Sequence, residues 1–179
     1  MTERTVRRTA RIAVLVAALG LATQAAAEWI GDARTKMGTS VEVQFWHEDA
    51  EEGARLLEAA MAEFDRIEAA MSTYHEDSEI TRVNADAAFG PMAVSEDLYE
   101  VVERSLEVSR LSDGAFDITY ESVGHLYALR DRVRPDDAAI AAGLPAIDHR
   151  HVLLDGAART IAFTAPGVRI NLGGIAKGW

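Results

Sequence analysis

Two glycines and a lysine near the end of the sequence carry the clearest local chemistry. Gly173 and Gly174 stand at an expected turn from a strand into a helix, and Lys177 follows them. Glycines at such a turn let backbone N–H groups approach a phosphate, to which a lysine adds a positive charge. The spacing is not the G-x-x-x-x-G-K-[ST] of a P-loop. These residues alone leave open both a phosphate-binding turn and a plain tight turn.

Three other places could present a surface to a flat ring. Tyr74 lies in a polar segment after a long helical pattern, where its ring could stack on a ligand or pack against the helix end. Met37 could lie against an aromatic ring or fill a gap. Residues 113–119 bring Phe116 and Asp117 together just after a helix. Phe116 fits a core position as well as it fits a ring contact.

Several other catalytic chemistries find no support. The sequence has no G-x-S-x-G motif, no H-E-x-x-H motif and no cysteine, which argues against acyl transfer and zinc hydrolysis. His149 and His151 have the i, i+2 spacing of a metal-binding pair. No further His or Cys completes a ligand set with them, so a metal role is not predicted there.

The elements that must position these residues begin with a strand and a long helix. Residues 36–46 alternate apolar and polar side chains, which is the period of a half-buried strand. Asp49, three residues before Glu52, predicts a helix start. One apolar stripe at helical spacing follows, made of Leu57, Met61, Phe64, Ile67 and Met71. The polar residues 72–88 then predict a loop.

A second helix and several short elements complete the pattern. Ser95 is the expected N-cap of a helix that ends near Gly114, which is placed to adopt a left-handed conformation. A short helix is expected within residues 133–144, with Pro135 at its first position and Gly143 after its last turn. Short β segments are predicted at residues 115–120, 151–154, 160–163 and 168–172.

Composition indicates a globular protein, and the N-terminal segment indicates an exported one. The 179 residues are 49% hydrophobic and carry a formal net charge of −11, which disfavours partners such as nucleic acid or anionic lipid. Residues 1–27 combine four arginines, a short apolar run and an Ala25-Ala26-Ala27 cleavage site, typical of a secretory signal peptide. A buried N-terminal helix is the alternative. With no cysteine for disulfides or a lipid anchor, we expect residues 28–179 to be a soluble periplasmic domain.

Five segments taken together resemble the ApbE-type FAD:protein FMN transferases. They are Met37-Gly-Thr, Met71-Ser-Thr-Tyr74, the stretch from Asp77 to Asn84, Gly114-Ala-Phe-Asp117-Ile-Thr119, and Leu172-Gly-Gly-Ile-Ala-Lys177-Gly. Each segment is weak alone. They occur in the order of the family and at about its spacing, across nearly all of residues 28–179, and they match the N-terminal portion of the family.

The resemblance implies an enzyme that binds FAD, splits its pyrophosphate with Mg²⁺, and transfers FMN to a threonine of an exported redox protein, releasing AMP. Met37 and Tyr74 would contact the isoalloxazine or its surroundings. The backbone carbonyl of Gly174 would be a metal ligand. The residues that the resemblance assigns to FAD are Met37, Tyr74, Ala115, Phe116, Asp117, Asn171 and Lys177. The implied fold is α+β, a largely antiparallel sheet with helices packed on it, similar to the T-fold-like ApbE architecture.

The sequence also departs from the family pattern. Asn171 stands where an aspartate is common, and the residues after Thr119 lack the usual Gly-Pro-Leu. The C-terminal half of the family, which holds the remaining metal ligands, is expected to lie beyond residue 179. Two alternatives therefore stand beside the transferase: an FAD pyrophosphatase, and a flavin-binding remnant without catalysis. The sequence does not identify the acceptor protein or the oligomeric state.

Overall fold

The computed structural model describes residues 27–128 and 131–178 as a mixture of helices and antiparallel strands. The signal peptide predicted at residues 1–27 lies outside the described residues, apart from Ala27. The described residues form two compact units, one of residues 27–34 with Ser40–Met61 and the other of Thr35–Thr39 with residues 62–128 and 131–178. Among the described residues, no helix has both the length and the apolar character needed to span a bilayer.

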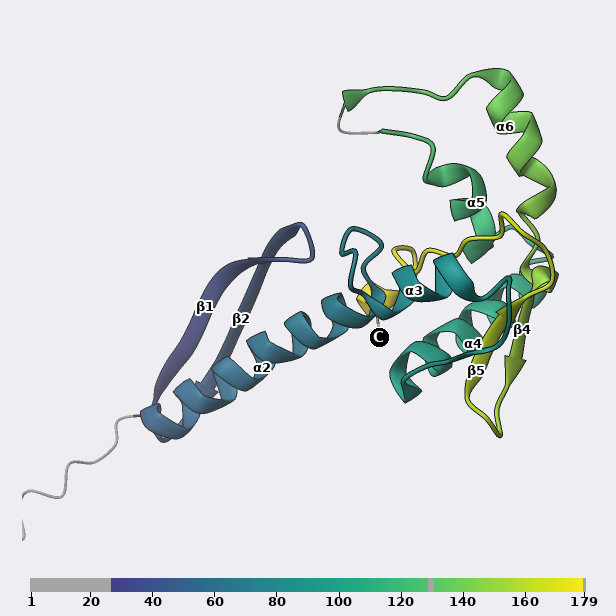
Figure 1. Ribbon diagram of the computed structural model, residues 1–179. Helices are drawn as coiled ribbons and strands as arrows, with labels where there is room; N and C mark the ends of the chain where they lie inside the picture. The colour runs from purple at the N-terminus through teal and green to yellow at the C-terminus, as the bar shows by residue number, and fades with distance from the viewer. Residues whose placement is uncertain (1–26, 129–130, 179) are drawn as a thin grey trace, which may run out of the picture. The chain divides into compact units, whose positions relative to one another are not determined.

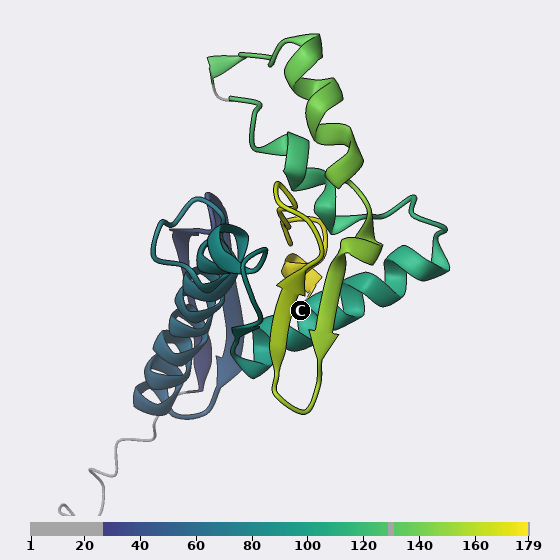
Figure 2. The ribbon, with the colours of Figure 1, turned by 45° about the vertical axis from the view of Figure 1, so that its right-hand side comes forward.

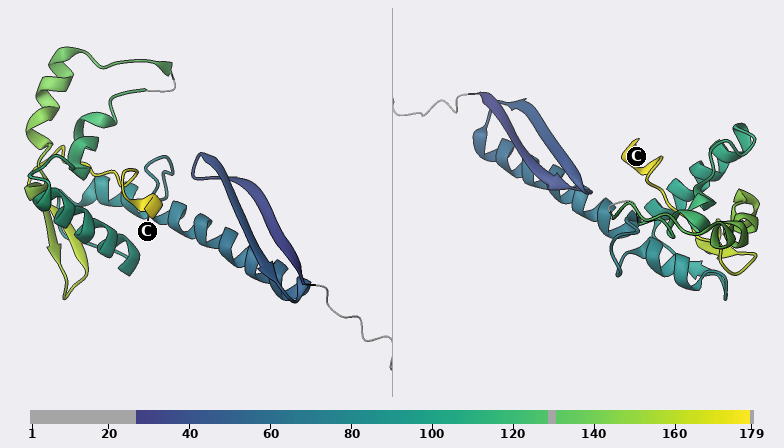
Figure 3. Two further views of the ribbon diagram at one scale, coloured as in Figure 1. Left: turned by 180° about the vertical axis from the view of Figure 1, so that it is seen from behind. Right: turned by 90° about the horizontal axis from the view of Figure 1, so that it is seen from above.

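The first unit is a β-hairpin alongside the N-terminal part of a long helix (Figures 1 and 3). Its strands are β1 (Glu28–Lys36) and β2 (Thr39–His47), which form a two-stranded sheet, and the helix is α2 (Ala50–Met71). β2 confirms most of the strand predicted at residues 36–46. The sequence pattern does not reveal β1, because its side chains are mostly exposed and polar.

The start of α2 follows the capping pattern in the sequence. Asp49 Oδ1 accepts hydrogen bonds from the N–H groups of Glu51 and Glu52, at 2.9 and 3.0 Å, which confirms the predicted helix start. In the first turns, Gly53 lies against β1. A Cβ added there would be 2.7 Å from Ile30 Cγ1, so the close approach of helix and hairpin requires glycine.

The second unit contains a short helix that the sequence did not reveal. α3 (Glu79–Asp86) is capped by Ser78, whose side chain accepts the N–H of Thr81 at 3.2 Å. The loop predicted for residues 72–88 is therefore wrong over this helix. Ile80, Val83 and Ala87 do have helical spacing, but the pattern covers only two turns within a polar stretch, which is too short to indicate a helix. The buried residues of α3 are Ile80, Val83 and Asn84.

A longer helix lies beside a small sheet in the same unit (Figure 2). α4 (Glu96–Leu111) is capped by Ser95, as predicted, and Gly114 follows its end with φ of +78°. The sheet is antiparallel in the order β3-β5-β4. Its strands are β3 (Met92–Ala93), β4 (Val152–Asp155) and β5 (Thr160–Phe163). Thus β4 and β5 confirm two predicted strands, and one core cluster joins the sheet to α4.

The β segment predicted at residues 115–120 is wrong. The chain there forms η1 (Ile118–Tyr120), a 3₁₀ turn that continues into α5 (Glu121–Gly124). Asp117 starts it: its Oδ1 accepts the N–H of Thr119 at 2.8 Å and the hydroxyl of the same residue at 2.6 Å. This side-chain capping competes with extended structure, which explains why the β-prone composition does not decide the outcome.

The short helix predicted within residues 133–144 is present, but its ends differ. α6 (Asp137–Gly143) is capped by Asp136, so Pro135 precedes the helix and is not its first residue. Gly143 is the last residue of α6, with φ of −86°, and does not follow the helix as predicted. A Cβ added at Gly143 would be 2.7 Å from Val123 Cγ2, so close packing explains this glycine. Two 3₁₀ turns follow, η3 (Leu144–Ala146) and η4 (His149–His151).

Residues 168–172 do not form the predicted strand, although their side chains alternate in burial as predicted. Val168, Ile170 and Leu172 are buried, yet no strand pairs with this segment in the described part of the chain. The buried side chain of Asn84 takes the place of a neighbouring strand. Its Oδ1 accepts the N–H of Ile170 at 2.7 Å, and its Nδ2 donates to the carbonyl of the same residue at 2.9 Å. The segment leads to η5 (Ala176–Gly178).

Candidate functional site

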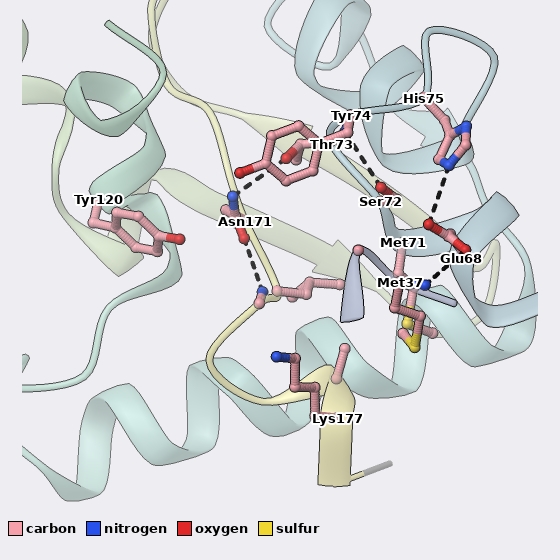
Figure 4. A pocket seen from close by; sticks show the side chains of 14 residues that line it. Met37, Glu68, Met71, Ser72, Thr73, Tyr74, His75, Tyr120, Asn171 and Lys177 are labelled. Carbon is pink, nitrogen blue, oxygen red and sulfur yellow. Dashed lines mark hydrogen bonds and ion pairs between the residues drawn. The ribbon is translucent and has the colours of Figure 1, made fainter. Parts of the chain in front are cut away.

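A cavity of about 600 Å³ lies within the second unit, where four segments distant in the sequence meet (Figure 4). The segments are the hairpin tip, the end of α2 with the loop after it, the end of η1, and the glycine turn before η5. Four residues that the sequence assigned to FAD line this cavity, namely Met37, Tyr74, Asn171 and Lys177. The fold therefore brings together half of the predicted site.

Met37 occupies a strained position at the hairpin tip. Met37 and Gly38 form the two-residue turn between β1 and β2, with φ of +51° and +70°. Two positive φ values define the turn type for which Asn-Gly is strongly preferred, and methionine is disfavoured at such a position. Glu68 Oε2 accepts the N–H of Met37 at 3.0 Å, which holds the tip against the end of α2. The methionine side chain is thereby placed in the cavity wall.

We expect Met37→Asn to increase stability and to weaken ligand binding. Asparagine tolerates positive φ, so the free energy of unfolding should rise by about 0.5–1 kcal/mol, as measured by urea denaturation. The apolar side chain is lost from the cavity, so affinity for the flavin that the resemblance implies should fall, as measured by fluorescence titration. Met37→Leu keeps an apolar side chain and should change stability little. A loss of stability in Met37→Asn would contradict the assigned turn.

Glu68 and His75 form a polar edge of the cavity that sequence reasoning missed. Glu68 Oε1 lies 3.2 Å from His75 Nε2, while its other oxygen binds the hairpin tip. Glu68 lies on the polar side of the α2 stripe, which gave no reason to expect a role in a site. The only sequence signal is that His75 follows it by seven residues, just past the end of the helix.

Asn171 and Lys177 play different parts in the cavity. The Asn171 side chain is fully engaged within the chain: it donates to Glu121 and Thr73 and accepts from Gly173. Because the N–H of Gly173 is already used by Asn171, it is not available to a phosphate. The Lys177 side chain, in contrast, makes no hydrogen bond or ion pair with any residue in 27–128 or 131–178. Its ammonium group is the positive charge that this cavity offers to an anion.

Two tyrosines flank the same space. Tyr74 is 81% exposed and Tyr120 is 44% exposed, and both line the cavity (Figure 4). Burial raises the pKa of the Tyr120 phenol, and the nearby Glu121 and Tyr74 raise it further. Tyr120 therefore stays a neutral phenol at physiological pH. An exposed aromatic face beside a buried polar wall suits a planar ligand that carries hydrogen-bonding groups.

The raised pKa of Tyr120 predicts a weaker fold at alkaline pH. A phenol whose pKa is higher in the folded state than in the unfolded chain, where it is near 10, contributes stability below pH ~10. This contribution is lost as the pH rises through the folded value. The free energy of unfolding between pH 9 and 11 should therefore fall less steeply in Tyr120→Phe than in the wild type. Identical slopes would contradict the pKa shift.

The other predicted site residues lie elsewhere. Phe116 packs on the glycine turn, since a Cβ added at Gly174 would be 3.2 Å from its Cε2. Asp117 lines a separate cavity, and its second oxygen accepts the N–H of His149 at 2.8 Å. Ala115 belongs to the loop after α4, next to Phe116. The structure therefore does not bring Ala115 and Asp117 into the cavity of Met37 and Tyr74.

No cluster of potential metal-binding side chains accompanies the predicted Gly174 ligand in the described part of the chain. No group of three or more His, Cys, Asp or Glu side chains in this part of the chain is arranged to hold a metal ion. His151 binds the hydroxyl of Thr164 at 2.6 Å, and His149 lies beside Asp117, so the two histidines do not act as a pair. Gly174, the predicted carbonyl ligand, lines a further pocket together with Lys177.

Sequence comparison relates the chain to a family of known enzymes. The sequence model of the ApbE family matches residues 37–179. A Vibrio cholerae protein named FAD:protein FMN transferase is 27% identical over 148 residues, which cover 80% of this chain and 44% of that protein. A Treponema pallidum protein of the same name is 32% identical over 130 residues, or 69% of this chain and 36% of that protein.

Solved structures give the same relationship. The flavin transferase ApbE from Vibrio cholerae matches 86% of this chain and 50% of its own chain, with a TM-score of 0.75 and 26% identity. The ApbE protein from Thermotoga maritima matches 84% and 49%, with a TM-score of 0.76 and 25% identity. The chain belongs to the ApbE family, and the predicted α+β fold is confirmed. It spans about half the length, or less, of the curated relatives that it matches.

Proposed function

We propose that this chain is the N-terminal part of an FAD:protein FMN transferase, an enzyme that moves FMN from FAD to a threonine of an exported redox protein. The observation that carries the proposal is the cavity that gathers Met37, Tyr74, Asn171 and Lys177, in a chain of the ApbE family. The Tyr74 face and the Met37 side chain suit a flat, partly apolar ring. Lys177 suits the phosphate that is attached to such a ring.

The proposed reaction is a phosphoryl transfer. The threonine oxygen bonds to the phosphorus of the FMN half of FAD, the bond to the bridging oxygen breaks, and AMP leaves, while the threonine proton is released. Such reactions depend on positioning and charge neutralisation more than on covalent chemistry by the protein. In a chain with a net charge of −11, Lys177, whose ammonium group has no partner among the described residues, is a local means of attracting the anionic substrate.

The proposed enzyme uses Mg²⁺, and the described residues would provide only part of its ligand set. Mg²⁺ prefers oxygen ligands and carboxylates, and the described residues supply the Gly174 carbonyl without a cluster of carboxylates beside it. The further ligands would come from sequence beyond residue 179, as the greater length of the relatives allows. Export to the periplasm, after removal of residues 1–27, is likewise part of the proposal.

The test is a reaction of the longer protein that carries this chain with FAD, Mg²⁺ and a threonine-bearing acceptor domain. Covalent FMN on the acceptor, seen by intact mass, together with released AMP would support the transferase. Free FMN and AMP with an unmodified acceptor would identify a pyrophosphatase instead. FAD binding without turnover would identify a flavin-binding module, and absence of FAD binding would overturn the proposal.

A further inference from the structure

The side-chain amide of Asn171 joins three segments of the cavity wall. Its Nδ2 donates to Thr73 Oγ1 at 3.3 Å, and its Oδ1 accepts the N–H of Gly173 at 2.8 Å (Figure 4). The same Nδ2 also donates to Glu121 Oε2 at 3.0 Å. Thr73 directly precedes Tyr74, and Gly173 begins the turn that leads to Lys177. One side chain therefore connects the two segments that carry the ring-facing and phosphate-facing groups.

The partner carboxylate is buried, which makes the contact costly to lose. Glu121 is 8% exposed at the start of α5, and a buried carboxylate requires hydrogen-bond donors. The Asn171 amide is one such donor. The position of Asn171 is also fixed through the backbone, because its N–H donates to the carbonyl of Ile118 at 3.0 Å. The amide and the carboxylate thus face each other from two well-anchored segments.

We propose that Asn171 and Glu121 are a matched pair of positioning residues, with a donor at 171 and an acceptor at 121 that together hold Tyr74 and the glycine turn in place. The ligand that benefits is the flavin of the proposed function, and this part of the inference rests on that function. The hydrogen-bonded pair itself does not depend on it.

The donor and the acceptor can exchange places between positions 171 and 121, but the two positions cannot both carry a carboxylate. Aspartate at 171 would set two carboxylates about 3 Å apart, where both cannot remain ionised, and the apparent pKa of the pair would rise. If Glu121 were also changed to glutamine, its amide could donate to the new carboxylate. The other oxygen of that carboxylate would still accept from Gly173, and the Thr73 hydroxyl would turn to donate.

Other titratable and charged groups surround the pair and must be the same in every variant. They are Tyr120 and His125 on the segment of Glu121, Arg169 beside Asn171, and Glu68, Tyr74, His75 and Lys177 around the cavity. The substitutions leave all of them unchanged. Differences in pH dependence among the variants therefore report on positions 121 and 171.

The experiment compares the full chain with N171D, E121Q and the double variant N171D/E121Q by thermal unfolding at pH 5 and pH 8. We expect N171D to unfold roughly 5–10 °C below the wild type at pH 8. Most of this loss should disappear at pH 5. The sign follows because a raised folded-state pKa gives stability at low pH that is lost as the pH rises through that value. The double variant should unfold within roughly 3 °C of the wild type at both pH values.

The controls separate the pair from a general structural effect. E121Q retains an acceptor for the Asn171 amide, so it should behave like the wild type without new pH dependence. An N171D protein whose stability loss is the same at pH 5 and pH 8, or a double variant no more stable than N171D, would overturn the pair. If N171D does not fold at pH 8, recovery at pH 5 or in the double variant still decides the question.

A binding measurement tests the positioning role. FAD titration at pH 8 should show weaker binding in N171D, by about fivefold or more, and recovery in the double variant. Recovered stability without recovered FAD affinity would overturn positioning, because only the fold would then depend on the pair. If the wild type itself binds no FAD, the proposed function fails, while the thermal experiment still decides whether the pair exists.

Discussion

Replacing Asn84 by alanine is expected to lower the free energy of unfolding by about 3 kcal/mol. Asn84 binds both the N–H and the carbonyl of Ile170 at 2.7 and 2.9 Å, in a place where both residues are buried. Alanine would leave one buried donor and one buried acceptor without partners, each at a cost of about 1–3 kcal/mol. Urea denaturation followed by circular dichroism measures the difference.

A matched control lies on the same helix. Asp86 ends α3 and is exposed, and no side-chain hydrogen bond is observed for it among the described residues. Asp86→Ala should therefore change the free energy of unfolding by less than about 0.5 kcal/mol. If Asn84→Ala cost no more than Asp86→Ala, the amide would not be supporting the segment at Ile170. The glycine turn that follows this segment would then need another explanation for its position.

Replacing Lys177 by glutamine is expected to raise the Kd for FAD roughly 10- to 100-fold, since hydrogen bonds to charged groups contribute about 1.5–3 kcal/mol. Lys177 lines the cavity and has no partner of its own within residues 27–128 and 131–178. Its charge is therefore free to meet a phosphate. Fluorescence titration at low and high salt measures the effect. The wild-type affinity should fall with salt more steeply than the affinity of the variant.

Two controls give this prediction its specificity. Lys177→Arg keeps the charge and should retain most of the affinity. Arg55→Gln removes the same charge from the exposed surface of α2, where Arg55 pairs with Glu52, and should leave FAD binding unchanged. Equal losses in Lys177→Gln and Arg55→Gln would mean that net charge, and not the position of the lysine, governs binding. An unchanged affinity in Lys177→Gln would make that residue part of the turn only.

The elements that could be predicted from the sequence are those with strong local signals. Asp49 and Ser95 cap helices because their short side chains accept backbone N–H groups that the first turn leaves unpaired. The apolar stripe of α2 and the alternation in β2 mark faces to be buried, and periodicity reports such faces directly. β5 is predicted to the residue for the same reason.

Two β segments are predicted wrongly because side chains there form hydrogen bonds with the backbone. Residues 168–172 have the burial of a strand, but their N–H groups bond to the Asn84 amide, the Ser122 hydroxyl and the carbonyl of Ile118 in a 3₁₀ turn, and not to another strand. Residues 115–120 are β-prone, but Asp117 caps a 3₁₀ turn there. Local propensity cannot anticipate these outcomes, because the competing partner lies on another segment or depends on side-chain geometry.

The sequence by itself determined the family, the main helices, and four residues that share one cavity. Only the tertiary structure decided what holds those residues in place. Met37 meets Glu68 across 31 positions, Asn171 meets Glu121 across 50, and Asn84 meets Ile170 across 86. The physical reason is that a buried polar group must find a partner wherever the folded chain provides one, and no periodic pattern encodes which distant residue that will be.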